Sequence, residues 1–303
     1  MKSSVCWENK FFTVGMIVFL MLFIIACSPG GNGPTPATWE TLASLSGDPA
    51  FSDYTPAGQS VLYTGIDTSM QEFTFPTTGN PQGVFTSLMN PPSDIDSYVS
   101  FAWVGDSLYM VDGNTVYAYS ITDDSWTTPV NGTLTYAHSQ SQSTADDSGF
   151  VYSFSDSNQL LKYNTTNNTY VYIATPSDMT TGEPRAAWDS QTMRVYLADY
   201  AHAGGFYAFN PADNSFTALA PLPDSAGMSD AFCSDRRGHI YTANSDYQVT
   251  KDVWMYTAAT DSWTKIAPLP FAHGSSAACT VSADGWLYFG DGDGDNFARI
   301  KIF

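Results

Sequence analysis

A two-residue motif, a bulky aliphatic residue followed by tyrosine, recurs along the chain and constrains its fold more than any other feature. The motif occurs at Leu62-Tyr63, Leu108-Tyr109, Val151-Tyr152, Val195-Tyr196, Ile240-Tyr241 and Leu287-Tyr288. Successive tyrosines are 46, 43, 44, 45 and 47 residues apart. This spacing predicts a repeat architecture, because each repeat is one supersecondary unit that buries its apolar face only by stacking on its neighbours.

A pair of aromatic residues seven positions apart follows the same period. The pairs are Tyr119 and Trp126, Tyr163 and Tyr170, Phe209 and Phe216, and Tyr256 and Trp263, separated by SITDDS, NTTNNT, NPADNS and TAATDS. Asn, Asp, Ser and Thr between two aromatic, alternating segments are typical of turns. Each pair therefore predicts two strands of a hairpin joined by a six-residue loop.

Each repeat supplies four predicted strands, which we name a to d. A run of small residues such as HGSSAACTV forms strand a, the aliphatic-tyrosine motif forms strand b, and the two aromatic residues mark strands c and d. Four antiparallel strands in about 45 residues predict a blade of a β-propeller rather than a coil of a solenoid.

The two ends of the repeat pattern are expected to share the last blade. The final segment ARIKIF, which ends at Phe303, is in register with a strand c. Trp39 and Leu42 are spaced like Trp263 and Ile266, which mark a strand d, so the N-terminal segment can supply the missing strand. Such closure leaves no bare sheet edge, which is the usual hazard of an open β-structure.

The number of outer strands predicts the number of blades. These strands are counted at Trp39, Phe85, Trp126, Tyr170, Phe216 and Trp263. We therefore predict an all-β, six-bladed propeller that spans residues 38–303 as a single domain, with the last blade closed by the N-terminal strand.

Parts of the repeats resemble kelch repeats. The segments YAFNPADNSFTALAPLP and WMYTAATDSWTKIAPLP resemble the second half of a kelch repeat, GWLYFGDG resembles its first half, and the resemblance covers about residues 39–303. The pattern departs from kelch at the double glycine after strand b, replaced by Val111-Asp112, Phe154-Ser155, Ala198-Asp199 and Ala243-Asn244. The resemblance implies a kelch-like propeller and is a weaker guide to function.

The first 37 residues predict export and lipid attachment. An apolar run of 16 residues from Phe11 to Ala26 would span about 24 Å as a helix, shorter than a hydrocarbon core of about 30 Å. Residues 1–26 are therefore predicted to be a signal peptide rather than an uncleaved membrane anchor. The tetrapeptide IIAC resembles the bacterial lipobox, which implies that Cys27 carries acyl chains such as palmitate.

The lipid predicts where the protein resides. Residues 27–37 are rich in Gly and Pro and predict a flexible tether between the lipid and the domain. Ser28 in place of Asp after the cysteine resembles the pattern of outer-membrane sorting. We expect a monomer at the bacterial outer membrane, in contact with the membrane only through its lipid, on either the periplasmic or the outer side.

Charge excludes one class of partner. The chain has a formal net charge of −19, with 11 basic and 30 acidic residues. Nucleic-acid binding depends on Lys and Arg that neutralise phosphates, so a chain this acidic is not expected to bind nucleic acid.

Two cysteines outside the predicted signal peptide and lipid site could form a disulfide. Cys233 and Cys279 lie on predicted innermost strands of adjacent blades. Cys233 is five residues before Gly238 and Cys279 is six before Gly285, which places them on opposite strand faces unless a bulge intervenes. Both a disulfide and two buried thiols are therefore considered.

Variable loops predict the binding face. In a four-strand meander the b–c loops and the d–a connections emerge on one face, and the irregular ones here are GIDTSMQE, DYAHAGG, NSDYQVTKD and GDGDGDN. The candidate ligand-binding residues on that face are Asp96, His138, Arg185, Tyr200, His202 and His273. The alternative for His138 and His273 is a structural role at equivalent strand starts.

One loop predicts a candidate calcium site. Asp291, Asp293 and Asp295 alternate in a Gly-rich loop that resembles the start of calcium-binding loops. The glutamate that closes an EF-hand loop is missing, and an acidic hairpin in water is the alternative.

The sequence contains few catalytic signatures. We find no G-x-S-x-G, H-E-x-x-H or Gly-rich phosphate loop, and no metal-spaced cysteine pair. The main prediction is a lipid-anchored envelope propeller that binds a protein or a glycan and needs no cofactor apart from possible calcium. The alternative is a cofactor-free sugar mutarotase or epimerase of the kelch-propeller type, using Arg185, His138 and His273.

Overall fold

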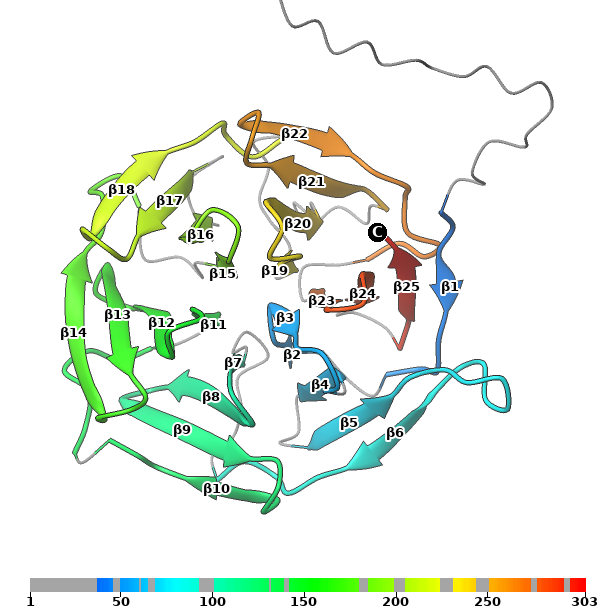
Figure 1. Cartoon of the computed structure of the whole chain (residues 1–303), viewed down its shortest axis with the longest axis horizontal. Coiled ribbons are helices and arrows are strands. Elements are labelled where there is room, and N and C mark those ends of the chain that lie inside the picture. The colour runs from blue at the N-terminus through cyan, green and yellow to red at the C-terminus, as the bar shows by residue number, and fades with distance from the viewer. Residues whose placement is uncertain are drawn as a thin grey trace, which may run out of the picture. The chain divides into compact units, whose positions relative to one another are not determined.

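The described part of the chain is an all-β propeller (Figure 1). The computed structural model describes residues 37–45, 50–59, 61–64, 69–92, 101–130, 132–138, 142–179, 185–198, 205–223, 231–243, 251–273, 277–291 and 295–303. Their strands form one sheet of five strands and five sheets of four, arranged as a ring around a common axis. The described residues contain no helix long and apolar enough to cross a membrane. The predicted all-β propeller is confirmed.

We number the sheets in chain order. The first contains β2 (Ala50–Phe51), β4 (Val61–Thr64), β5 (Met70–Thr74) and β6 (Val84–Ser87); the second contains β7 (Ala102–Val104), β8 (Ser107–Asp112), β9 (Thr115–Ser120) and β10 (Ser125–Thr127). The third contains β11 (Ser143–Ala145), β12 (Phe150–Ser155), β13 (Gln159–Asn164) and β14 (Thr169–Ala174).

The remaining sheets follow the same plan. The fourth contains β15 (Arg185–Asp189), β16 (Arg194–Ala198), β17 (Phe206–Asn210) and β18 (Ser215–Ala218); the fifth contains β19 (Phe232–Ser234), β20 (His239–Ala243), β21 (Val253–Thr257) and β22 (Ser262–Lys265). The sixth contains β23 (Ala278–Ser282), β24 (Trp286–Gly290) and β25 (Phe297–Lys301), together with β1 (Glu40–Thr41) and β3 (Tyr54–Thr55).

The aliphatic-tyrosine motif lies on the second strand of each sheet, and Val151 and Tyr152 on β12 show how it is buried. Both residues are 0% exposed. Adjacent strand residues point to opposite faces, so a motif buried at both positions requires neighbours on both faces of the sheet. The Tyr152 hydroxyl donates to Asp146 Oδ2 at 2.8 Å, which satisfies its polar end in the preceding turn.

The predicted hairpins form, with the two aromatic residues of each pair directly opposite one another. The pairs are Tyr119 and Trp126, Tyr163 and Tyr170, Phe209 and Phe216, and Tyr256 and Trp263. The connecting loop is shorter than the six residues predicted, because the first and last of the six also pair, as Ser120 does with Ser125. The last loop residue is Asp124, Asn168, Asn214 or Asp261, with φ of 44°, 56°, 58° and 44°.

A repeated contact, which we call the tryptophan latch, joins neighbouring sheets at the outer rim. Trp263 Nε1 donates to the Ala220 carbonyl at 3.1 Å, and the Ala220 amide donates to Asp261 Oδ1 at 2.8 Å. Trp126 repeats the contact with the Met89 carbonyl at 3.0 Å. The latch therefore links strand d of one sheet to the chain that leaves the sheet before it.

The N-terminal segment closes the ring as predicted. Strand β1 pairs with β25, with Glu40 opposite Arg299. Trp39 Nε1 donates to the Ala267 carbonyl at 3.0 Å, which repeats the latch, and the Leu42 amide donates to the Phe297 carbonyl at 2.8 Å. The Ile266 amide makes the corresponding bond to the Val253 carbonyl at 2.9 Å.

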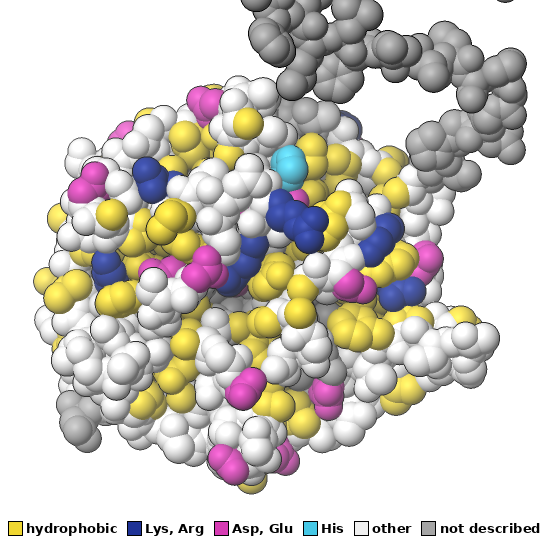
Figure 2. Space-filling view, in the orientation of Figure 1, with side chains coloured by type: hydrophobic (Ala, Val, Ile, Leu, Met, Phe, Trp, Pro, Cys, Tyr) yellow, Lys and Arg dark blue, Asp and Glu magenta, His cyan; other side chains and the backbone are white. Residues whose placement is uncertain are grey.

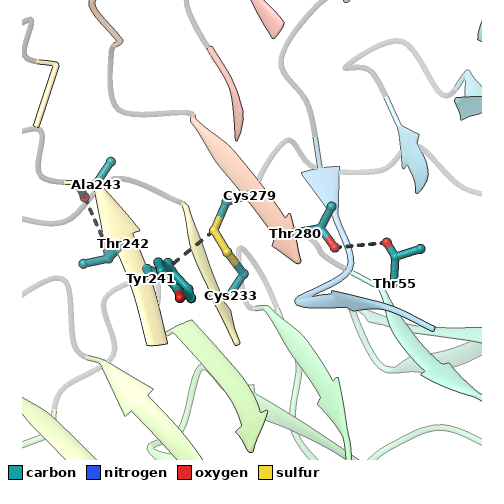
Figure 3. The surroundings of a disulfide bond; sticks show 7 residues. All are labelled: Thr55, Cys233, Tyr241, Thr242, Ala243, Cys279 and Thr280. Atoms are coloured by element: carbon teal, nitrogen blue, oxygen red, sulfur yellow. Dashed lines mark hydrogen bonds between the residues drawn. A yellow bond between two sulfur atoms is a disulfide. The ribbon is translucent and has the colours of Figure 1, made fainter. Parts of the chain in front are cut away.

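Cys233 and Cys279 form a disulfide between the innermost strands of the fifth and sixth sheets, β19 and β23 (Figure 3). Their Cα atoms are 5.8 Å apart. The two residues do occupy opposite strand faces, since Cys233 pairs with Tyr241 whereas Thr280, the neighbour of Cys279, pairs with Tyr288. Opposite faces favour this bond rather than oppose it, because one face of each sheet packs on the other face of the next.

Candidate functional site

A short segment that interrupts the repeat pattern lies at the axis of the ring. Ser52–Thr55, which we call the central segment, follows β2 and contains β3. Strand β3 pairs in parallel with β23 of the sixth sheet, and Thr55 Oγ1 lies 3.1 Å from Thr280 Oγ1. Trp103 of the second sheet donates from Nε1 to Ser52 Oγ at 3.1 Å.

Asp53 links the central segment to three further sheets. Its Oδ2 accepts the Thr144 hydroxyl at 2.8 Å and the Trp188 amide at 3.1 Å, and its carbonyl accepts the Ser234 amide at 3.2 Å. These partners belong to the third, fourth and fifth sheets. The central segment therefore contacts the innermost strands of the second to sixth sheets and follows directly from that of the first.

The Asp53 carboxyl is an ionisable group that is buried at the axis of the ring. It is 3% exposed, and Oδ1 has no hydrogen-bond partner among the described residues. Burial raises the pKa of this carboxyl above its ordinary value, and the positive charge of Arg236 counteracts the rise only in part.

Arg236 is held in place beside this carboxyl from three directions. Its Nη1 lies 3.0 Å from Asp147 Oδ1, and its Nη2 donates to the Ala145 carbonyl at 3.1 Å. The guanidinium carbon lies 4.6 Å from the centre of the Tyr54 ring. The Arg236 side chain is 14% exposed, whereas that of Asp147 is 55% exposed, so the carboxylate presents most of its surface to solvent.

Arg237 is less constrained. Its guanidinium lies 3.7 Å from the centre of the Phe303 ring, and the described residues hold no ion-pair partner for it. A guanidinium stacked on a ring keeps its N–H groups available at its edge, because the ring contacts only the face.

These groups border a cavity of about 520 Å³, which we call the mouth cavity. It is lined by Tyr54, Pro56, Trp103, Val104, Gly105, Asp146, Asp147, Gly149, Ser190, Asp235, Arg236 and Arg237. Apart from Tyr54 and Pro56, the lining comes from the region of the turns between the first and second strands of the second to fifth sheets. Figure 2 shows Lys and Arg side chains near the centre of the molecule in this view and others toward its edges. The volume is within the range of about 300–1,000 Å³ typical of small-molecule sites.

Two aspartates of the lining have structural roles. Asp146 Oδ1 accepts the amides of Ser148 and Phe150 at 2.9 Å. Asp235 Oδ1 accepts the amides of Arg237 and His239 at 2.8 and 3.1 Å. These bonds shape the turns and leave Asp147 and Arg237 as the charged groups of the lining most available to a ligand, beside Arg236, whose two terminal nitrogens already contact Asp147 and the Ala145 carbonyl.

A second cavity lies on the same face, and we call it the side cavity. Its volume is about 450 Å³, and it is lined by Pro56, Ala57, Gly58, Gln59, Phe75, Ser282, Ala283 and Asp284. Pro56 lines both cavities. The two cavities are therefore neighbours.

Three of the predicted ligand groups, His138, His273 and Arg185, are buried and do not line either cavity. His138 is 0% exposed, with Nδ1 3.1 Å from Ser153 Oγ and Nε2 3.2 Å from Tyr172 Oη. Burial lowers the pKa of His138 to about 4, so the ring is neutral at pH 7. Arg185 and His273 are also 0% exposed, and the His273 ring centre lies 5.5 Å from that of Phe289. Their role in binding remains a prediction.

Other predicted site residues lie outside the described residues. They are Cys27, Asp96, Tyr200, His202 and Asp293. Asp291 is buried, and its Oδ2 accepts Asn296 Nδ2 at 3.0 Å, whereas Asp295 is exposed. No group of three or more metal-ligating side chains occurs within the described ranges, and calcium binding by this loop remains a prediction.

The mouth cavity opens on the face of the turns between strands a and b. The irregular loops of the sequence had predicted ligand binding on the opposite face, where the b–c loops and the d–a connections emerge. A signal for it exists in the sequence, because Arg236-Arg237 is the one pair of adjacent basic residues in the chain. Asp53 has no such signal, since the segment around it has no counterpart in the other repeats.

Comparison with known proteins supports the fold. The chain matches no protein-family profile, and none of the curated proteins is similar to it in sequence. Among solved structures, a protein of unknown function from Bacteroides thetaiotaomicron VPI-5482 matches with a TM-score of 0.65 and 11% identity, over 88% of this chain and 76% of that chain. The structure of YjhT matches with a TM-score of 0.60 and 11% identity, over 88% of this chain and 94% of that chain. At this identity the likeness concerns the fold alone.

Proposed function

We propose that the chain is a six-bladed propeller of kelch type, each sheet being one blade, and that it binds a glycan in the mouth cavity. The observation that carries the proposal is the presence of Arg236, Arg237, Asp147 and the Tyr54 ring in one concave site. Arginine only donates hydrogen bonds and a carboxylate only accepts them. A sugar hydroxyl does both, so a carbohydrate uses both kinds of group together.

A glycan fits this face better than a protein partner does. A protein interface usually needs about 800 Å² from each partner, with a buried apolar centre. The exposed large apolar side chains of the described residues are dispersed over the surface, at Val84, Met89, Val171, Met193 and Phe303. A concave site with fixed polar groups instead suits a small polar ligand. An envelope protein as partner is the alternative outcome of the test below.

The proposal includes a location at the bacterial envelope. It rests on the apolar run of residues 11–26 and on the lipobox resemblance before Cys27. Acyl chains on Cys27 would anchor the domain, and residues 28–37 would act as its tether. Labelling of cells with a clickable palmitate analogue is expected to tag the wild-type protein and not the Cys27→Ser variant. Equal labelling of both would reject the anchor.

A cofactor-free sugar mutarotase or epimerase is the second candidate, favoured by Asp53. This residue precedes Tyr54 of the cavity lining and has a carboxyl with a raised pKa and one oxygen without a partner among the described residues. A carboxyl whose pKa is raised above its ordinary value holds its proton to higher pH and can act as a general acid or base. NMR of each bound sugar would reveal faster anomer exchange with the wild type than with Asp53→Asn if this candidate is correct.

The test of the binding proposal is a glycan array with the wild type and two arginine variants. Arg237→Ala is expected to lose retention, because it removes the guanidinium without an ion-pair partner in the described residues. Arg194→Ala is the matched control, since Arg194 Nη1 donates to the carbonyl of Met193 outside the cavity. Retention of no glycan, or equal loss in both variants, would reject the proposal, and a protein pull-down would then identify another partner.

A further inference from the structure

We infer that the ligand is an oligosaccharide that extends across both cavities, with one unit in the mouth cavity and a neutral unit in the side cavity. This inference rests on the proposed function, because it specifies the length and charge of the glycan. Each cavity, at about 520 and 450 Å³, is large enough for one small ligand. Pro56 lines both of them, so two linked units can occupy both at once.

The turn between the two cavities is held in place on both sides. Gln59 closes the turn with its amide 3.2 Å from the Pro56 carbonyl. Its Nε2 donates to Asp106 Oδ1 of the second sheet at 3.4 Å. On the other side the Ala283 amide of the sixth sheet donates to the Thr55 carbonyl at 3.0 Å. A groove that exists before binding costs less to order than one that must form around its ligand.

The side cavity combines an aromatic wall with small residues and polar edges. Phe75 is half-buried, and its ring centre lies 5.6 Å from that of Tyr288, which fixes its position. A methyl group added at Gly58 would meet no atom within 4 Å, so the space beside the turn is open. A ring face next to hydroxyl and carboxylate groups, here Ser282 and Asp284, suits a sugar ring that has an apolar face and a polar rim.

Charge limits the kind of unit that the side cavity accepts. Its lining contains one carboxylate, Asp284, and no Lys or Arg among the described residues. The carboxylate already accepts the Ser282 hydroxyl at Oδ1, with a distance of 2.6 Å. A uronic acid placed there would face the Asp284 carboxylate, and Lys301, which contacts this residue, donates its Nζ to the Asp284 carbonyl and is not part of the lining. We therefore expect the unit in the side cavity to be neutral.

The experiment measures affinity against chain length. Purified protein is titrated calorimetrically with ladders of one to six units of gluco-, manno- and N-acetylglucosamine oligosaccharides and, as the charged probe, of galacturonate. At least one neutral ladder is expected to bind about tenfold or more tightly as its length grows, because the second unit binds at a high effective concentration. The galacturonate ladder is expected to show no such gain.

Two variants assign the gain to the side cavity. Ala57→Trp fills that cavity from an exposed position, and the long and short members of the ladder should then bind alike. Ala212→Trp is the matched control at an exposed turn outside both cavities, and it should keep the full gain. The unfolding midpoint of each variant is measured first, and Ala283→Trp replaces Ala57→Trp if the latter does not fold.

The possible outcomes separate this inference from the proposed function. Binding that does not depend on length, or a gain that survives in the folded side-cavity variant, overturns the inference and leaves the mouth cavity as a glycan site. A gain with galacturonate equal to that with neutral ladders overturns the neutral assignment. Failure of every ladder at every length, together with an empty glycan array, overturns both proposals.

Discussion

The outer rim and the axis of the propeller join its sheets in different ways. At the rim, the tryptophan latch recurs at Trp39, Trp126 and Trp263, and each copy joins one sheet to its neighbour. At the axis, Asp53 alone connects to three sheets, and no other described residue repeats its contacts. Rim contacts are therefore local and interchangeable, whereas the axis depends on single groups whose loss affects several sheets at once.

The largest expected effect is at the disulfide of the axis. The Cys233→Ala/Cys279→Ala double variant removes a link between residues 46 positions apart. The loop-entropy relation predicts a loss of about 4 kcal/mol in the free energy of unfolding. Guanidinium unfolding of the wild type with and without dithiothreitol checks this, because the reduced wild type should match the double variant. Equal stability of all the forms would show that the link contributes nothing.

The substitution Asp53→Ala is expected to have the next largest effect on the free energy of unfolding. It leaves the Thr144 hydroxyl and the Trp188 amide without their buried carboxylate acceptor, at a cost of about 3 kcal/mol. Asp53→Asn keeps a side-chain oxygen that can accept a hydrogen bond, and it should lower the free energy of unfolding by less than about 1 kcal/mol. Urea unfolding at pH 7 compares the three proteins. Equal losses in both variants would mean that the charge, and not the acceptor, holds the axis together.

Each tryptophan latch should contribute less to the free energy of unfolding than the disulfide or Asp53 does, and the latches should act independently of one another. Trp126→Phe and Trp263→Phe retain a ring and lose one hydrogen bond to a carbonyl, which predicts a loss of about 1 kcal/mol each. The double variant should lose the sum of the two, since distant sites with no shared partner are additive. A double loss far from the sum would contradict the view that rim contacts are local.

The last test concerns the pH dependence of stability. Because the pKa of Asp53 is raised in the folded state, the folded protein binds a proton more tightly than the unfolded chain. The contribution of the Asp53 carboxyl to the free energy of unfolding is therefore fully present below the ordinary pKa of the group, and it is lost as pH rises through the pKa of the folded state. Unfolding from pH 4 to 8 should show the wild type losing stability relative to Asp53→Asn as pH increases. A constant difference would reject the raised pKa.

Much of the rim was predictable because its chemistry is local. The aromatic pairs and the polar residues between them lie within eight consecutive positions, so the hairpin is visible in the sequence. The six-residue loop was too long by two residues because the flanking residues of the turn also pair. The similarity of Trp39 and Leu42 to Trp263 and Ile266 predicted the closing strand, since both pairs make the same contacts.

The two cavities were not predicted from the sequence. The loops favoured by their irregular sequences lie partly outside the described residues, and the two cavities open on the other face. His138 and His273 are both buried at equivalent repeat positions, away from these cavities. The sequence placed Cys233 and Cys279 correctly on opposite strand faces. That placement was taken to oppose a disulfide, because the packing of one sheet on the next was not considered, but the structure has the disulfide.

The sequence by itself determined the repeat period, the hairpins with their polar turns and the strand that closes the ring. Each of these depends on residues that are near in sequence or repeat at a fixed spacing. Only the tertiary structure decided that Asp53, Arg236 and Asp147 meet at the axis. They come from different repeats, and the ring brings them together because every innermost strand faces the same narrow space, where burial and charge then set the properties of the site.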